Sequence, residues 1–84
     1  MRAVYVYLLK DDPDRIRSVA PRHAGYWQGA ALPGYQGGPF SDRTGGLVMF
    51  DCESNQHATE LAASDPFVVE GLVESGWVKE WLPE

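Results

Sequence analysis

The segment from Arg2 to Lys10 (RAVYVYLLK) constrains the fold most, because it is short, rich in β-branched and aromatic residues, and apolar on both faces. Such a composition predicts a β-strand. Alternation sorts its side chains into two apolar sets: Val4, Val6 and Leu8 on one face, and Ala3, Tyr5, Tyr7 and Leu9 on the other. A strand with one face in water should alternate with polar residues. This strand therefore needs cover on both sides.

A helix is expected after this strand. Asp12 supplies an N-cap acceptor and Pro13 suits the first helical position. Pro21 lacks an N–H and is expected to interrupt the segment. We therefore predict a short opening turn followed by a main helix from about Pro21 to Ala31, with a narrow apolar stripe at Ala20, Ala24, Trp27 and Ala31.

The second half of the chain also predicts strands and helices in alternation. Residues 32–41 are rich in Gly and Pro and allow at most a short edge strand, whereas residues 45–53 read as a clear strand. Ser54 can cap a helix, and Asp65-Pro66 can start a further helical segment that Gly76 would end. Residues 77–82 (WVKEWL) predict the last strand.

The resulting order, βαββαβ, predicts an α+β ferredoxin-like fold with a four-stranded antiparallel sheet, as one domain over residues 1–84. Both helices should cover one sheet face. Some of Tyr5, Tyr7, Leu47 and Met49 are expected on the other face, which nothing in the chain covers. A chain this short is marginally stable, and a single cysteine excludes an internal disulfide. We therefore expect a homodimer packed sheet to sheet.

Composition excludes several function classes. The net charge is −5, from 12 acidic and 7 basic residues, with no basic cluster for nucleic acid or a membrane surface. No apolar run approaches the roughly 20 residues of a spanning helix, no signal peptide is recognisable, and the lone thiol favours the cytoplasm. Cys52 and His57 lack the partners of a tetrahedral metal site, so we expect no metal and treat Cys52 as a core residue.

His23 and Asp65 are the candidate catalytic residues. An imidazole titrates near neutral pH and suits general acid–base chemistry, and the alternative is a partly buried helix histidine that hydrogen-bonds the backbone. Capping alone would select Asp65 before Pro66. The two roles are compatible, because one carboxylate oxygen can cap while the other orients an imidazole N–H.

Substrate contacts are expected nearby. The glycines at 34–38 and 45–46 lack the Lys-Ser/Thr of a phosphate loop, and turn chemistry explains them. A glycine loop still lets backbone approach a ligand, so Gly38, Pro39 and Phe40 are predicted to form a pocket wall, with Trp27 as a further contact.

Taken together, these residues resemble the YciI-like family of dimeric α+β barrels. The resemblance rests on Pro21-Arg22-His23, Gly37-Gly38-Pro39, the strand at Gly46-Leu47-Val48, and, most specifically, Asp65-Pro66-Phe67. It implies a ferredoxin-like fold dimerised through its sheets, and a catalytic His–Asp pair that maps onto His23 and Asp65. Relatives include muconolactone isomerase-like proteins and a dehydrochlorinase of chlorinated hydroxyquinols. The stretch from His23 to Pro39 is shorter than the family pattern.

The leading hypothesis is a cofactor-free isomerase or lyase, dehydrochlorinase-like, that performs proton transfer on a small cyclic or carbonyl compound. His23 would be the acid–base group and Asp65 its orienting partner. The alternative is a non-catalytic dimeric module that binds an unknown small-molecule ligand or assists a larger protein, because folds of this kind host many functions.

Overall fold

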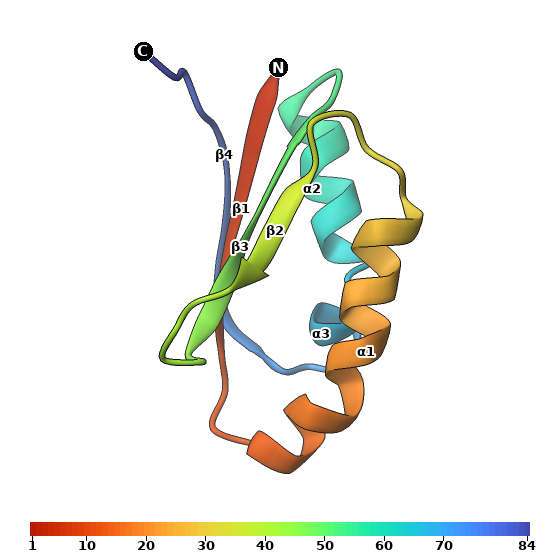
Figure 1. The fold of residues 1–84 in the computed structure, drawn as a ribbon, viewed down its shortest axis with the longest axis vertical. Helices are drawn as coiled ribbons and strands as arrows, with labels where there is room; N and C mark the ends of the chain where they lie inside the picture. Colours follow the sequence, from red (N-terminus) through yellow and green to blue (C-terminus); the bar gives the residue numbers. More distant parts are fainter.

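The structure, a computed structural model, describes all of residues 1–84 and contains four strands and three helices (Figure 1). None of the helices combines the length and the apolar character that crossing a membrane requires. The elements, in chain order, are β1 (Arg2–Leu9), α1 (Pro13–Gly29), β2 (Gln36–Pro39), β3 (Gly45–Asp51), α2 (Asn55–Ala63), α3 (Pro66–Val69) and β4 (Val73–Glu80).

The strands form one antiparallel sheet in the order β2-β3-β1-β4. All three helices lie on the same side of this sheet, with α1 beside α3 and α2 (Figure 1). The expected ferredoxin-like α+β fold is confirmed. The short second strand is also confirmed: β2 has four exposed residues and pairs only with β3.

The structure decides which of the four residues named for the uncovered face lie there. Ala3, Tyr5 and Tyr7 are buried beneath the helices, so the two tyrosines do not belong to the uncovered face. Their neighbours on β3, Val48 and Phe50, complete the helix-covered core. Because both faces of β1 are apolar, alternation alone could not decide which face the helices cover.

The uncovered face of the sheet carries the other apolar set. Cross-strand register places Val4 opposite Met49 and Val6 opposite Leu47, and these side chains are half-buried in the single chain. Trp77 pairs with Val6 from the other side and is 47% exposed. The predicted placement of Leu47 and Met49 on this face therefore holds.

Helix α1 runs without a break through Pro21, which the sequence predicted to interrupt it. Its N-cap is Asp12, as expected, which accepts a hydrogen bond from the Arg15 N–H at 3.4 Å. Pro21 lies on the exposed side of the helix, where water can hydrate the Arg17 carbonyl that loses its partner. Packing of Val19 and Trp27 against the sheet outweighs the local cost.

Helix α3 ends earlier than predicted, at Val69 instead of near Gly76. Gly71 is the terminating residue: its φ of +71° is left-handed, the Gly71 N–H donates to Val68, and the Leu72 N–H donates to Phe67. This pattern is a Schellman motif, which satisfies the last carbonyls of a helix. Gly76 instead lies inside β4, opposite Tyr7.

The sequence suggested that turn chemistry explains Gly45 and Gly46. In the structure they are instead the buried first two residues of β3. A β-carbon on Gly45 would overlap the Tyr7 carbonyl oxygen, and one on Gly46 would overlap the Tyr7 hydroxyl. Close approach to Tyr7, and not a special backbone conformation, is therefore what requires glycine at these positions.

Candidate active site

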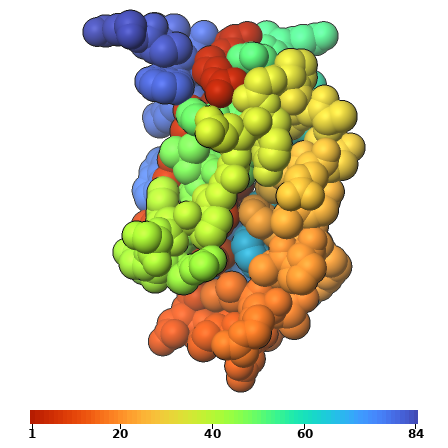
Figure 2. Space-filling view, viewed as in Figure 1, coloured from red at the N-terminus to blue at the C-terminus, as the bar shows by residue number.

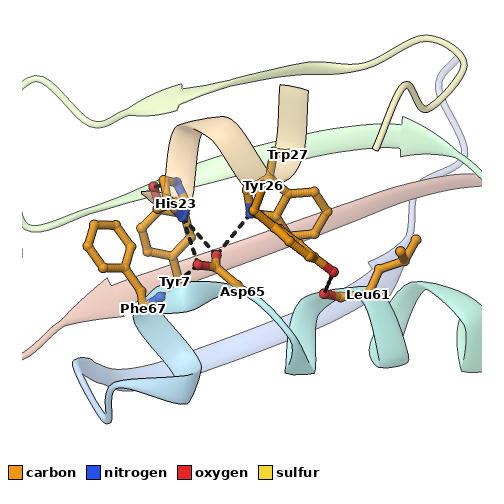
Figure 3. Close-up of polar contacts among 7 residues, drawn as sticks. All are labelled: Tyr7, His23, Tyr26, Trp27, Leu61, Asp65 and Phe67. Atoms are coloured by element: carbon orange, nitrogen blue, oxygen red, sulfur yellow. Dashed lines mark hydrogen bonds and ion pairs between the residues drawn. The ribbon is translucent and has the colours of Figure 1, made fainter. Parts of the chain in front are cut away.

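Asp65 is fully buried, at 0% exposure, in the connection between α2 and α3. It caps α3 as predicted, because the Phe67 N–H donates to Oδ1 at 2.8 Å. Trp27 Nε1 donates to Oδ2 at 2.9 Å, and His23 Nδ1 lies 2.9 Å from Oδ1 and 2.8 Å from Oδ2 (Figure 3). Three N–H groups thus surround one carboxyl group, an arrangement that suits the ionised carboxylate.

The contacts of Asp65 determine which nitrogen of His23 carries a proton. A carboxylate only accepts hydrogen bonds, so Nδ1 of His23 must donate to it. In the neutral imidazole this leaves the lone pair on Nε2, which lies 3.2 Å from the Tyr7 hydroxyl. The imidazole also stacks on the Phe67 ring, with 4.4 Å between centroids and 26° between planes. Its orientation is therefore fixed on three sides.

Tyr7 supplies a hydrogen-bond donor next to the imidazole. Its side chain is buried, and burial together with the nearby negative charge of Asp65 raises the pKa of Tyr7 to about 12. The phenol therefore keeps its proton at neutral pH and donates to Nε2 of a neutral His23. The order Asp65, His23, Tyr7 forms a continuous hydrogen-bonded chain (Figure 3).

A pocket of about 340 Å³ opens onto this chain. It lies between α1 and the β2–β3 hairpin, and the space-filling view shows a hollow there whose floor has the blue of the α3 region (Figure 2). The His23 side chain is 14% exposed, whereas Asp65 contributes nothing to the lining. Among the lining residues are Tyr7, His23, Tyr35, Gly38, Pro39 and Arg43.

The structure brings some of the residues named from sequence to this pocket and not others. Gly38 and Pro39 line it. Phe40 follows β2 and does not line it, and Trp27 is buried at 1% exposure with its indole N–H on Asp65. Trp27 is therefore placed to hold the carboxylate, not to touch a ligand.

Sequence reasoning missed two tyrosines of the lining, Tyr7 and Tyr35. Tyr7 was one of four residues considered for the uncovered face of the sheet, and Tyr35 precedes an edge strand that has no clear pattern. The glycine opposite Tyr7 was the available signal, since a large side chain needs a small neighbour across the strands.

Arg22, which precedes His23, does not line the pocket. Its guanidinium lies 3.8 Å from Oε1 of Glu70, and that oxygen also accepts from Arg15 at 3.4 Å. These exposed ion pairs connect α1 to the C-cap of α3 and contribute little energy individually.

Comparison with known proteins adds the family context. The profile of a family described as YCII-related domain matches residues 3–82. The uncharacterized protein YjpA of Bacillus subtilis (strain 168) is 43% identical over 44 residues, a match covering 52% of this chain and 51% of YjpA. The chain thus spans about half the length of that curated relative.

A solved structure shares the fold. It is the 5-chloro-2-hydroxyhydroquinone dehydrochlorinase TftG from Burkholderia phenoliruptrix AC1100, in complex with 2,5-dihydroxybenzoquinone. The TM-score is 0.84 over 98% of this chain and 94% of the other, at 21% sequence identity. At that identity the likeness establishes the architecture alone.

Proposed function

The chain belongs to the family of YCII-related domains, and on that premise we propose that it is a cofactor-free enzyme in which His23 and Asp65 carry out proton transfer on a small cyclic or carbonyl compound. One observation carries the proposal. The Trp27 indole N–H and the Phe67 backbone N–H hold a fully buried carboxylate, and this carboxylate in turn holds Nδ1 of His23, a residue that lines a pocket of ligand size.

The chemistry follows from this orientation. When the Tyr7 hydroxyl turns from Nε2 to a substrate oxygen, the Nε2 lone pair is freed and takes a proton from an acidic C–H or O–H of the substrate, and the electron pair moves into the adjoining carbonyl or ring. The imidazolium that forms is stabilised by the Asp65 carboxylate at 2.8 Å. Return of the proton to a different atom completes an isomerisation, whereas departure of a leaving group such as chloride with the electron pair completes an elimination. Tyr7 is placed to donate to a substrate oxygen as charge develops there.

The TftG likeness supplies the first compound to test. Purified protein would be incubated with 5-chloro-2-hydroxyhydroquinone in D₂O, and chloride release and deuterium incorporation would be followed by titration and by NMR. We expect turnover in the wild type and in His57→Ala, whose imidazole lies on α2 and does not line the pocket. His23→Ala should lose turnover by a factor of about 10²–10⁴ while remaining folded.

The controls separate catalysis from mere binding. An active His23→Ala protein refutes the assignment of His23. If 2,5-dihydroxybenzoquinone binds in the pocket of the wild type but no tested ring compound exchanges protons or releases chloride, the chain is better described as a ligand-binding module. The binding measurement also works in His23→Ala, so loss of folding and loss of chemistry are distinguishable.

We further propose that two copies associate through the uncovered sheet face. The support is the apolar surface of that face, which includes Val6 and Leu47 at its centre and Trp77 at 47% exposure. A contiguous apolar surface of this kind is unusual for a small monomer. Covering it with a copy of itself would bury apolar area at roughly 25 cal/mol per Å².

A charge on this face tests the association. Val6→Lys should be monomeric or poorly folded, because two lysines would meet at the centre of the interface. Val69→Lys introduces the same charge at an exposed apolar site on α3 and should leave the assembly unchanged. Sedimentation equilibrium at micromolar concentration reports the mass. A monomeric wild type would reject the proposal.

A further inference from the structure

The lining of the pocket carries a single permanent charge, and that charge is positive. Arg43 lines the pocket, whereas no aspartate or glutamate does. This is unexpected in a chain whose net charge is −5. We propose that the pocket takes a single-ring compound bearing an anionic oxygen group, and that Arg43 recognises that group while the ring lies over His23. The inference rests on the function proposed above and narrows it to a substrate class.

The position of Arg43 supports this role. It lies in the hairpin between β2 and β3, where its N–H donates to the Phe40 carbonyl at 3.0 Å. Its φ of +64° is left-handed, a conformation that is uncommon for residues other than glycine. Glycine or asparagine would satisfy this turn with less strain, so the presence of an arginine calls for a reason beyond the turn itself.

The guanidinium of Arg43 has no partner within the chain: it forms neither an ion pair nor a hydrogen bond, and its residue is exposed. The adjacent acid, Asp42, is engaged elsewhere. Its Oδ1 accepts from the Thr44 hydroxyl at 2.7 Å and from the Thr44 N–H at 3.1 Å. Arg43 is therefore available to an incoming anion.

The charged residues of the neighbouring groove do not cancel the preference of the pocket for an anion. Arg43 also borders a wider groove, whose lining includes Asp11 and Asp12 but also Lys10 and Arg17. Acidic and basic groups are balanced there, whereas the inner pocket has only Arg43. The guanidinium thus lies at the boundary between a groove of mixed charge and a pocket with a positive rim.

The size and remaining lining of the pocket limit the ligand. A volume of about 340 Å³ is near the lower end of the range for small-molecule sites, which is roughly 300–1,000 Å³. Leu9, Ile16 and Val48 contribute apolar walls suited to a planar ring. The planar fork of a guanidinium matches a carboxylate or an ionised ring hydroxyl.

The test compares near-isosteric probes that differ in charge, using NMR titration of the full chain. Benzoate is compared with benzamide, and 4-nitrophenolate with 4-nitroaniline, at a pH where the phenol is ionised. We expect the wild type to bind one or both anions about tenfold more tightly than the neutral partner, with shifted signals from pocket residues. The pair with the larger ratio tells whether the anion is a carboxylate or a ring oxygen.

Variants assign the preference to Arg43. In Arg43→Gln, the ratio of the affinity for the anion to the affinity for its neutral partner should fall close to one. Arg43→Lys should keep part of this ratio. Arg17→Gln removes the same charge from α1 outside the inner pocket and should keep the full ratio. Arg43→Gly relieves the left-handed strain, so it should unfold at a higher temperature while also losing the preference.

Two results overturn the inference: no preference for either anion in the wild type, or an undiminished preference in Arg43→Gln. Neither result depends on turnover. His23→Ala should retain the anion preference even though it loses catalysis. A failure at Arg43 therefore leaves the proposed function standing, and a failure at His23 leaves the anion site standing.

Discussion

Both carboxylate oxygens of Asp65 lie within 2.9 Å of Nδ1 of His23, although 42 residues separate the two in the chain. The contact joins the middle of α1 to the N-cap of α3. Asp65 is buried in the core, whereas His23 reaches the pocket, so the hydrogen bonds between them connect a core residue to a pocket residue. Changes at Asp65 should therefore affect both stability and catalysis.

Asp65→Asn tests this dual role. An amide offers one acceptor atom and turns an NH₂ group toward a neighbouring donor, so at least one of Trp27 Nε1, the Phe67 N–H and His23 Nδ1 loses its partner. We expect a loss of about 3 kcal/mol in the free energy of unfolding, measured with urea. The ¹⁵N spectrum of His23 should also change, because its tautomer is no longer fixed. Asp14→Asn, at an exposed acid of α1, should change neither.

The two neighbouring tyrosines of β1 should respond in opposite ways to loss of the hydroxyl. The Tyr5 hydroxyl is buried and has no hydrogen-bond partner, so Tyr5→Phe removes an unsatisfied polar group and should stabilise the fold by about 1 kcal/mol. Tyr7→Phe removes a donor to His23 Nε2 and should cost about 1 kcal/mol. Chemical denaturation of both variants measures the difference, and equal effects would contradict the geometry.

Stability should decrease at alkaline pH because of these tyrosines. Burial raises the pKa of Tyr7 to about 12, above the ordinary value of 10.0, and raises the pKa of Tyr5 as well. An unfolded chain loses these protons near pH 10, whereas the folded chain holds them longer. The stability is therefore fully present below pH 10 and decreases as the pH rises toward 12. The loss is on the order of 1.4 kcal/mol for each unit by which a pKa is raised.

Urea denaturation at a series of alkaline pH values measures this decrease, with tyrosinate absorbance as the direct readout of ionisation. In Tyr7→Phe, the free energy of unfolding should decrease less between pH 10 and pH 12, because the Tyr7 hydroxyl is absent. If the unfolding free energy stays constant from pH 10 to pH 12 in the wild type, the tyrosines are not protected as the structure indicates.

Gly46→Ala should be harmful, whereas Gly38→Ala, on the neighbouring strand, should be tolerated. A β-carbon on Gly46 overlaps the Tyr7 hydroxyl, so either Tyr7 or β3 must move, at a cost of about 1–3 kcal/mol. A β-carbon on Gly38 meets open space. Thermal unfolding measures the cost. Displaced Tyr7 and His23 signals in the NMR spectrum of Gly46→Ala would show that the site itself is disturbed.

Much of the architecture could be predicted from local chemistry. Asp12, Ser54 and Asp65 all cap helices as their side chains suggest, with the His57 N–H donating to Ser54. The strand from Gly45 to Asp51 could also be predicted from the sequence, because its apolar pattern is bounded by a turn. These features depend on neighbours in sequence, which a reader of the sequence can see.

The remaining features depend on tertiary contacts. Pro21 breaks an isolated helix, but here the packing of α1 against the sheet maintains it. The face of β1 that the helices cover could not be read from alternation, which is why Tyr7 was missed. His23 and Asp65 could each be named from their local chemistry, and the family resemblance supported pairing them, but a separation of 42 residues carries no geometric information by itself.

The short outer strand β2 determines how the sheet ends. Pro39 has no N–H that could donate to a further strand pairing with β2. The two glycines before it present no side chains against which such a strand could pack. At the opposite border, β4 carries Glu74, Lys79 and Glu80, charges that discourage lateral pairing. Both borders of the sheet thus disfavour the ribbon-like, edge-to-edge growth from which fibrils form.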